Sequence, residues 1–348
     1  MPVEAEDLVG INEIADMAKV SRQAVANWRV RSSDFPSPIV ELASGPVFRR
    51  SQVRAWMRRK KMPMAHVFSM INLKGGVAKT TTTVALAETL SASFGKRVLV
   101  IDLDPQTNAT TMMIGEERWK KLNGNGHTLA RLFQDALDPD NKKFNLEASL
   151  QKKVSDVSEA KSVDLLPSSL DLIDVQDQLA TIPSGKYYST NPIELLWRAV
   201  KAKLDDYDVV IVDCPPNLGI ITLNGLRISQ HYVIPTIPDY LSTYGIPQIV
   251  NRIAGFSAEI AEHVVPLGII ATKYQVQSTV HNTVLGNLKD SKDATLFKTV
   301  IKQTNQAASA AEYIPQKRTL IQKYGSEPNG LASTYKTLAK EILARLES

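Results

Sequence analysis

Two lysines, two glycines and two threonines fall within eight residues, in the run Lys74-Gly75-Gly76-Val77-Ala78-Lys79-Thr80-Thr81. The run follows an apolar, strand-like segment, 67–73, and precedes a helix-like segment. Glycines between a strand and a helix let the backbone approach phosphate oxygens, and N–H groups at a helix N-terminus attract anions. Lys79 can then reach the β- and γ-phosphates, and the Thr80 hydroxyl can bind Mg²⁺. The spacing predicts a phosphate-binding loop for ATP or ADP with Mg²⁺.

Carboxylates end two further apolar runs. Asp102 and Asp104 follow the run 98–101, and Asp213 follows the run 209–212. Such runs are typical of buried parallel strands, whose carboxyl ends form the ligand edge of an open α/β sheet. Alone, Asp102 and Asp104 would be better explained as a solvated turn, but a phosphate-binding loop in the same chain favours a shared site. We expect Asp213 to act on Mg²⁺ through a water, because Mg²⁺ loses its water reluctantly.

The loop departs from the common pattern G-x-x-x-x-G-K-[ST]. Leu73 and Ala78 stand where that pattern has glycine, and Lys74 precedes the glycine pair. The string K-G-G-V-A-K-T-T resembles the deviant Walker A motif of the ParA/MinD family of ATPases. The resemblance implies that Lys74 crosses a dimer interface to phosphates bound by the other subunit, as a cation supplied in trans. Ala78 replaces the family's usual glycine and would alter the hydrolysis rate if this position needs a positive φ.

The resemblance covers residues 65–348. The segment Asp102-Leu103-Asp104-Pro105-Gln106 is similar to the family's D-x-D-P-Q, which implies that Asp104 positions the attacking water and Asp102 supports the Mg²⁺ shell. The segment around Pro238 is similar to the family's base-side loop, which implies an adenine contact. The implied site residues are Lys74, Gly75, Gly76, Val77, Ala78, Lys79, Thr80, Thr81 and Pro238 for the nucleotide, Thr80, Asp102 and Asp213 for the metal, and Lys74, Lys79 and Asp104 for catalysis.

Composition sets outer limits. The chain has 348 residues, 43% hydrophobic and 22% charged, which fits two globular domains. Its single cysteine, Cys214, excludes an internal disulfide framework and a cysteine-ligated iron–sulfur cluster within one chain, and suits the cytoplasm. We expect Cys214 to be a buried residue and not a nucleophile. No apolar stretch approaches the roughly 20 residues that span a bilayer.

Positive charge is concentrated near the N-terminus. Residues 20–61 hold ten basic and two acidic side chains, a net charge of +8 (ten minus two) against +5 for the whole chain. Residues 11–18 and 22–29 are expected to form two short helices joined by a tight turn, with Ser21 as the N-cap of the second. The order predicts a helix-turn-helix, and the charge favours a nucleic-acid partner.

A hairpin over 40–50 with a turn at Ser44-Gly45-Pro46, then a helix over 52–60 capped by Ser51, would complete this module. It resembles the winged helix-turn-helix of the MerR/excisionase type. Amide side chains suit adenine edges, and arginines suit guanines or phosphates. The predicted DNA contacts are Ser21, Arg22, Gln23, Asn27, Arg29, Arg49 and Arg50. A small basic helical domain without DNA specificity is the competing interpretation.

We therefore expect a winged helix-turn-helix domain over 1–62, a linker over 60–64, and a P-loop α/β domain over 65–348 with a mostly parallel sheet flanked by helices. The resemblance implies a cytoplasmic, nucleoid-associated ATPase that partitions a plasmid or chromosome. It would dimerise on ATP, bind DNA nonspecifically, and hydrolyse ATP slowly unless stimulated by a ParB-like partner. The N-terminal domain could add operator binding and autorepression.

Two other functions stay open. One is a transcription regulator switched by ATP, with all DNA contact in residues 1–62. The other is a membrane-associated, MinD-like ATPase using its C-terminal helix. That helix, over 331–348, is weakly basic and lacks tryptophan and phenylalanine, so we expect it to pack on the core. A second DNA surface would use cations of the C-terminal half, namely Arg252, Lys273, Lys289, Lys292, Lys298 and Lys302.

Overall fold

The computed structural model describes residues 8–18, 20–60, 65–179, 181, 191–260, 263–326 and 330–347. These residues form two compact units. The first runs to Ala65 and includes Lys203–Asp208, and the second runs from His66 to Ala202 and again from Val209. Of the predicted linker, residues 61–64 lie outside the described residues. The inclusion of Lys203–Asp208 in the first unit has no signal in the sequence.

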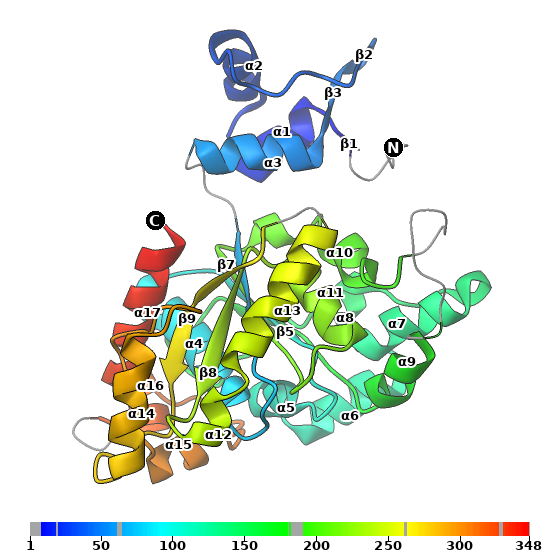
Figure 1. The fold of residues 1–348 in the computed structure, drawn as a ribbon. Coiled ribbons are helices and arrows are strands. Elements are labelled where there is room, and N and C mark those ends of the chain that lie inside the picture. Colours follow the sequence, from blue (N-terminus) through cyan, green and yellow to red (C-terminus); the bar gives the residue numbers. More distant parts are fainter. Residues whose placement is uncertain are drawn as a thin grey trace. The chain divides into compact units, whose positions relative to one another are not determined.

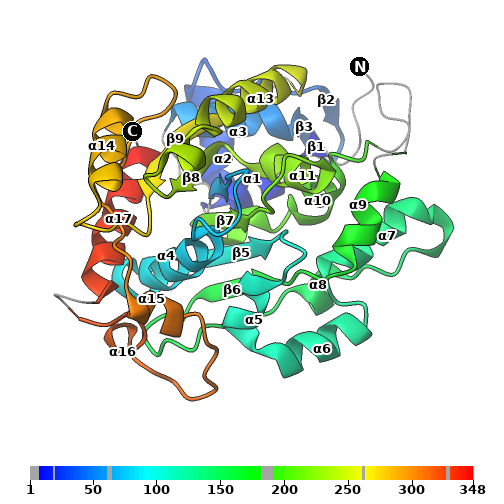
Figure 2. The ribbon, with the colours of Figure 1, turned by 60° about the horizontal axis from the view of Figure 1, so that its bottom comes forward.

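Six parallel strands form the sheet of the second unit (Figures 1 and 2). Their spatial order is β6-β5-β7-β4-β8-β9, and their bounds are β4 His66–Met70, β5 Val98–Asp102, β6 Val163–Leu166, β7 Val209–Asp213, β8 His231–Thr236 and β9 Val265–Ala271. All five residues of β5 and of β7 are buried, which explains their continuous apolar runs. Asp213 pairs in register with Asp102 on one side and Met70 on the other. The predicted parallel α/β sheet is confirmed.

Helices cover both faces of this sheet. Figures 1 and 2 show α4 and α5 on one face and α11 and α13 on the other. The helices are α4 Lys79–Phe94, α5 Asn108–Ile114, α6 Glu116–Gly124, α7 Leu129–Leu137, α8 Leu146–Ser149, α9 Leu172–Leu179, α10 Leu195–Val200, α11 Ile220–Ile228, α12 Tyr240–Thr243, α13 Ile246–Glu259, α14 Thr279–Lys289, α15 Asn305–Ser309, α16 Leu320–Tyr324 and α17 Ala332–Leu346, with a 3₁₀ turn at Pro139–Asn141. Among the described residues, no helix has the length and apolar character needed to cross a bilayer.

The C-terminal helix α17 packs into the core, as its apolar spacing predicts. Tyr335, Leu338, Ile342 and Leu346 are buried in the same cluster as residues of α4. These apolar side chains are therefore buried by packing within the unit.

A buried ion cluster anchors α4 from its middle. Glu88 of α4 accepts hydrogen bonds from the Lys323 ammonium (2.8 Å) and the Tyr324 hydroxyl (2.6 Å). Lys323 also pairs with Asp156 (2.7 Å), which accepts from Arg318 (2.8 Å). Lys323 and Glu88 are fully buried. Two carboxylates and two cations thus balance one another inside the core.

The first unit has its own small core. Its elements are β1 Leu8–Val9, α1 Ile11–Ala18, α2 Arg22–Arg31, β2 Val40–Leu42, β3 Gly45–Arg49, α3 Arg50–Arg59 and a 3₁₀ turn at Leu204–Asp206, and the strand order is β1-β3-β2, antiparallel throughout. Aromatic rings bind the elements together. Phe35 meets Trp56 at a centroid distance of 4.7 Å and Phe48 at 5.4 Å, in edge-to-face contacts.

Two local predictions in this unit are wrong. The hairpin turn is Ala43-Ser44, because Leu42 pairs with Gly45 and Glu41 with Pro46, which places Gly45 and Pro46 inside β3. Ser51 does not cap the last helix, since α3 already begins at Arg50. Both shifts move a boundary by one or two residues, where propensity is weakest and strand pairing decides.

Candidate functional site

The loop between β4 and α4 has an open backbone with local strain. Gly76 has a φ of +74° and Ala78 a φ of +61°, both in the left-handed region. Glycine adopts this region freely, whereas a residue with a Cβ pays roughly 1–2 kcal/mol. A Cβ on Gly75 or Gly76 would meet no atom within 4 Å. The space over the glycine pair is therefore open, and Ala78 does occupy a position with positive φ.

The donors of this loop are available to a ligand. Among the described residues, none of the hydrogen bonds found uses the backbone N–H groups of residues 75–78 as donors. The buried Lys79 ammonium donates to the carbonyl oxygens of Asn72 (3.2 Å) and Lys74 (3.3 Å). Burial lowers the pKa of Lys79, although Asp213 and Asp104 act to raise it. Free N–H groups beside a buried cation make a cradle for an anion.

Asp213 lies beside the first turn of α4. Its carboxylate accepts hydrogen bonds from the hydroxyls of Thr80 (2.7 Å) and Thr83 (3.1 Å). Burial raises the pKa of Asp213 to about 6, with Asp104 adding to the effect and Thr80 and Lys79 opposing it. A buried carboxylate with a raised pKa is short of positive charge, which a cation at this point would supply.

Asp102 and Asp104 have different environments. Both Asp102 oxygens are occupied, one by the backbone N–H of Asp104 (3.1 Å) and the other by the N–H (2.8 Å) and hydroxyl (2.7 Å) of Thr110. Burial raises the pKa of Asp102 well above its usual range. Asp104 is 7% exposed and accepts from the backbone N–H of Gln106 (2.9 Å). Asp102 thus fixes the turn that presents Asp104.

These residues fit a phosphate group with Mg²⁺. The oxygens of Thr80 and Asp213 are hard donors of the kind Mg²⁺ prefers. Within the described residues, no group of three or more acidic, histidine or cysteine side chains could hold a metal. Mg²⁺ at this site would therefore need phosphate and water oxygens as well. Cys214 is fully buried, and burial raises the pKa of its thiol, so the structure gives it no nucleophilic character.

The Lys74 ammonium contacts residues that follow β8, a segment that also contains Pro238. The Lys74 ammonium donates to the Ser242 hydroxyl (2.8 Å) and pairs with Asp239 (3.5 Å). Pro238, predicted beside adenine, is buried next to Asp239 between β8 and α12. Thr81 is the third residue of α4 and is half-buried. The structure therefore brings Lys79, Thr80 and Asp213 together and places the Lys74 ammonium on a different loop.

Comparison with known proteins identifies the family. The family described as an AAA domain matches residues 65–265. The sporulation initiation inhibitor protein Soj of Bacillus subtilis is 29% identical over 284 residues, 81% of this chain and 99% of Soj. The chain belongs to the ParA/Soj family of partition ATPases. The chromosome-partitioning ATPase Soj of Thermus thermophilus is also 29% identical, over 80% of this chain and 96% of its own.

A solved structure supports the same fold for this ParA-family chain. Cobyrinic acid a,c-diamide synthase from Mycobacterium smegmatis, with bound ATP analog and magnesium, is similar with a TM-score of 0.61 and 26% identity. The match covers 80% of this chain and 94% of the synthase.

The predicted DNA contacts of the first unit differ in exposure. Ser21 caps α2 by accepting from the backbone N–H of Ala24 (3.2 Å). Four exposed side chains follow it along the helix: Arg22, Gln23, Asn27 and Arg29. Of these, Arg29 forms an ion pair with Glu41 of β2. α2 therefore presents a polar face, as its sequence predicts.

Arg49 and Arg50 are only half-exposed. Arg49 pairs with Leu8 in the antiparallel sheet, and Arg50 places a guanidinium nitrogen 3.9 Å from the Met17 sulfur. Both side chains are thus less available to a ligand than those of α2. In the second unit, all six predicted C-terminal cations are exposed, namely Arg252, Lys273, Lys289, Lys292, Lys298 and Lys302.

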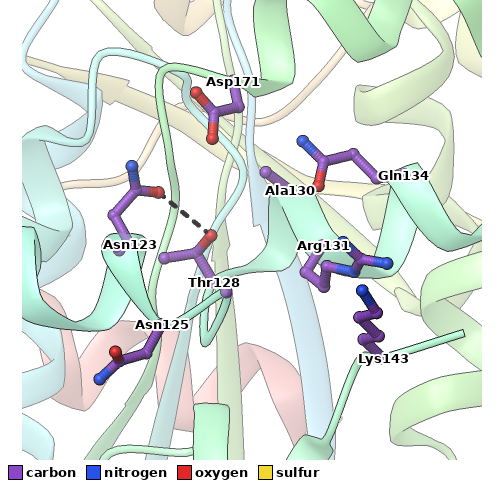
Figure 3. A pocket seen from close by; sticks show the side chains of 10 residues that line it. Asn123, Asn125, Thr128, Ala130, Arg131, Gln134, Lys143 and Asp171 are labelled. Atoms are coloured by element: carbon purple, nitrogen blue, oxygen red, sulfur yellow. Dashed lines mark hydrogen bonds between the residues drawn. The ribbon is translucent and has the colours of Figure 1, made fainter.

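A separate cavity of about 330 Å³ lies among α6, α7 and the loop before α9 (Figure 3). Figure 3 shows Arg131 and Lys143 near one another, with Asp171 across the cavity. Arg131 is already bound by Asp135 (2.7 Å) and the carbonyl of Asn141 (3.0 Å). With both signs of charge on its walls, the cavity selects no single class of ligand. It contains no residue of the P-loop or of the strand-end carboxylates.

Sequence reasoning missed the residues that support the loop from neighbouring strands. Asn72 accepts from the backbone N–H of Lys74 (2.9 Å) and donates to the Pro235 carbonyl (2.8 Å). The Thr272 hydroxyl, just after β9, donates to the carbonyl of Val77 (3.0 Å). Neither residue belongs to a motif. Asp239 and Ser242 had a usable signal, since an aspartate before a short helix is a common N-cap.

Proposed function

We propose that this chain is a Mg²⁺-dependent ATPase that dimerises on ATP and drives DNA partition. The observation that carries the proposal is that the ammonium groups of two lysines of one loop lie in different places. Lys79 is buried over the P-loop, whereas the Lys74 ammonium binds a neighbouring loop and forms no hydrogen bond or ion pair with residues 75–81 among the described residues. Because Lys79 already occupies the P-loop of its own subunit, Lys74 is available to act on the phosphates of a second subunit.

Each site residue has a defined task in this proposal. The N–H groups of residues 75–78 and the Lys79 ammonium would bind the phosphates of ATP or ADP. Thr80 and Asp213 would hold Mg²⁺, which neutralises charge on the phosphates when bound. Asp104 would orient the attacking water, with Asp102 fixing its turn. Lys74 of the other subunit would stabilise the charge that develops during phosphoryl transfer.

The surface around Lys74 is suited to burial in a dimer. Tyr240, Leu241 and Tyr244 next to its anchor are 61%, 81% and 76% exposed. Leu73, next to Lys74 in the chain, lines a hollow of about 730 Å³ together with residues 216–218 and residues of α13. Exposed aromatic and aliphatic side chains beside a functional loop favour a protein interface.

DNA binding in this proposal uses two surfaces. The six exposed cations of the C-terminal half would contact phosphates without sequence preference on an ATP-bound dimer. The exposed face of α2 would read an operator, which would make the chain an autorepressor. A ParB-like partner would accelerate a slow basal hydrolysis. The similarity to proteins named chromosome-partitioning ATPases supports this assignment.

The proposal is tested by the full chain carrying Arg22→Ala, Gln23→Ala and Asn27→Ala, which removes the three exposed α2 contacts that have no ion pair with β2. Binding of random-sequence DNA is measured with ATP, ADP or no nucleotide, with Lys79→Ala added as the nucleotide-free control. ATP-dependent binding that disappears with Lys79→Ala supports partition. Absence of binding with every nucleotide contradicts it and favours a second candidate, an ATP-switched regulator.

The regulator has one observation in its favour, the separate core and polar α2 face of the first unit. It predicts that all DNA contact resides there. A membrane-associated function has less support, because the apolar side chains of α17 are buried in the core of the second unit.

A further inference from the structure

We propose that Thr107 is a further catalytic residue, whose hydroxyl holds the attacking water together with the carboxylate of Asp104. This role rests on the proposed function, because it completes the water site of the ATPase. Thr107 is not among the residues that the sequence predicts for the site. Its backbone, its hydroxyl and its place in a tight turn each set it apart from an ordinary threonine before a helix.

The backbone of Thr107 is strained. Its φ of +56° lies in the left-handed region, which glycine adopts freely and where a β-branched residue is an outlier. Of the described residues other than glycine, only Ala78, Lys153 and Lys273 also have a positive φ. Ala78 belongs to the phosphate-binding loop, and Lys273 follows Thr272, which binds that loop. Such strain persists only where the surrounding structure enforces it, and it concentrates at functional sites.

Thr107 does not cap the helix that it precedes. It stands directly before α5, where a threonine ordinarily caps the helix through its hydroxyl. Thr319 does this at α16, because its φ is −75° and its hydroxyl accepts from the backbone N–H of Gln322 (3.1 Å). Thr107 forms no such bond, and Asp102 accepts from the N–H of Thr110 (2.8 Å) in α5. Helix capping therefore does not explain the threonine at position 107.

The hydroxyl of Thr107 has no hydrogen-bond partner in the part of the chain that the structure describes. This is unusual, because Thr107 is only 5% exposed and polar groups of nearly buried residues are generally paired. The hydroxyls of Thr82 and Thr89 are also unpaired, but these two are sealed from solvent, whereas that of Thr107 is not. The hydroxyl of Thr107 is therefore open to a small molecule although most of its residue is buried.

A tight turn joins Thr107 to Asp104. The backbone N–H of Thr107 donates to the carbonyl of Asp104 (2.9 Å), so the two are the first and last residues of a four-residue turn, with Cα atoms less than about 7 Å apart. Asp104 uses its Oδ1 for the N–H of Gln106 (2.9 Å), and its Oδ2 has no hydrogen bond among the described residues. The Ser168 hydroxyl holds the turn by donating to the Asp104 carbonyl (2.7 Å). Two unpaired oxygens of one fixed turn can thus bind the same water.

Two acceptors can orient one attacking water. The Asp104 carboxylate accepts from one O–H of the water and the Thr107 hydroxyl from the other, which leaves a lone pair for the γ-phosphorus. The water oxygen bonds to this phosphorus, the bond from phosphorus to the oxygen bridging to the β-phosphate breaks, and ADP leaves. One proton of the water stays on the phosphate, and the other reaches solvent through the Asp104 carboxylate. Because Thr107 contacts the water and not the nucleotide, its loss lowers kcat and leaves nucleotide affinity unchanged.

Three substitutions in the full chain separate the hydroxyl from the strain. Thr107→Val keeps the branched shape and removes the hydroxyl, Thr107→Ser keeps the hydroxyl, and Thr107→Gly removes both the hydroxyl and the strain. The basal kcat with MgATP should fall about 5- to 20-fold in the valine and glycine variants and stay within about twofold of wild type in the serine variant. The dissociation constant of ADP, measured by calorimetry, should change less than about twofold in all three.

Thermal melts of the nucleotide-free chain give a readout that does not depend on hydrolysis. Thr107→Gly should melt about 1–4 °C above the wild type, because glycine relieves the positive φ, and Thr107→Val should melt within about 1 °C of it. Thr319→Val is the matched control, since it removes the cap of α16 and should lower the melting temperature without changing kcat. Higher stability together with slower turnover in Thr107→Gly supports a strained residue that acts in hydrolysis, which a purely structural role does not predict.

The outcomes distinguish this role from the proposed function. A wild-type chain that turns over ATP no faster than about twice the rate of Thr107→Val overturns the role of Thr107 alone. A serine variant as slow as the valine variant overturns it as well, because turnover would then not follow the hydroxyl. A wild-type chain that binds ADP but shows no Mg²⁺-dependent turnover of ATP overturns the proposed function, and the role of Thr107 with it.

Discussion

Two ionic clusters bear on the same helix, α4, and they are built in opposite ways. At its N-terminus, Asp104 and Asp213 act on one buried ammonium, that of Lys79, and Asp102 acts on both of these carboxylates. Nine residues further along, Glu88 and Asp156 are matched by Lys323 and Arg318, with every contact between 2.6 and 2.9 Å. The first cluster has excess negative charge and open N–H donors, and the second is balanced.

The difference in charge balance distinguishes a ligand-binding cluster from a structural one. Burial that is not fully compensated raises the pKa of Asp213 and lowers that of Lys79. Buried groups with such destabilised charged forms are typical of ligand-binding and catalytic sites. The balanced cluster holds α4 in place against α16 and the loop before β6. Charge imbalance, more than charge itself, therefore marks the functional end of the helix.

The largest effect is expected from breaking the balanced cluster. Lys323→Met leaves Glu88 and Asp156 buried beside a single guanidinium, so the free energy of unfolding should fall by about 3–5 kcal/mol. Urea unfolding followed by circular dichroism measures it. Lys120→Met is the control: its ion pair with Glu116 is exposed, and its loss should leave the free energy of unfolding nearly unchanged. Equal losses in the two variants would contradict the comparison.

Removing the lysine of the proposed partner site should affect turnover without affecting stability. Lys74→Ala should lower ATP turnover by roughly 100-fold or more, as for cations supplied in trans. Its melting temperature should stay close to that of the wild type, because its side chain is 40% exposed. Coupled-assay turnover and thermal melts measure the two quantities. Near-normal hydrolysis would contradict the proposal that Lys74 acts on ATP bound by another subunit.

The unbalanced cluster predicts a pH-dependent stability of the nucleotide-free protein. Asp213 has a pKa of about 6 in the folded chain against an ordinary value of 3.8, so its contribution is present below pH 3.8 and lost as pH rises through 6. Asp213→Asn should therefore be more stable than wild type at pH 8, by about 1–3 kcal/mol, and equal to it near pH 4. Without Mg²⁺ and nucleotide, a variant less stable at pH 8 would contradict this sign.

The smallest effect concerns the strained alanine. Ala78→Gly places glycine at a φ of +61°, so the free energy of unfolding should rise by about 0.5–1 kcal/mol. Ala92→Gly, inside α4, should lower it by about the same amount. Denaturant titration of both variants tests the opposite signs. Destabilisation by both would show that Ala78 is not strained.

Much of the fold could be predicted because its signals are local. The strands that end at Asp102 and Asp213 are continuous apolar runs, and the loop at 74–81 joins a strand to a helix in one short segment. The partners of Glu88 could not be predicted, since Lys323 is 235 residues away and lies in no periodic pattern. The contact of Lys74 with Asp239 was missed for the same reason, because the two residues meet only through the pairing of β4 with β8.

The central claim is that the unbalanced site is completed by another subunit, and subunit mixing tests it most directly. Lys74→Ala lacks the lysine to donate but keeps its own Asp104, whereas Asp104→Ala can donate Lys74 but has no working site. An equal mixture with MgATP should form mixed dimers in which one site is complete, and recover about a quarter of wild-type turnover. Turnover no higher than the sum of the two variants alone would contradict the account, because Lys74 would then act within its own subunit.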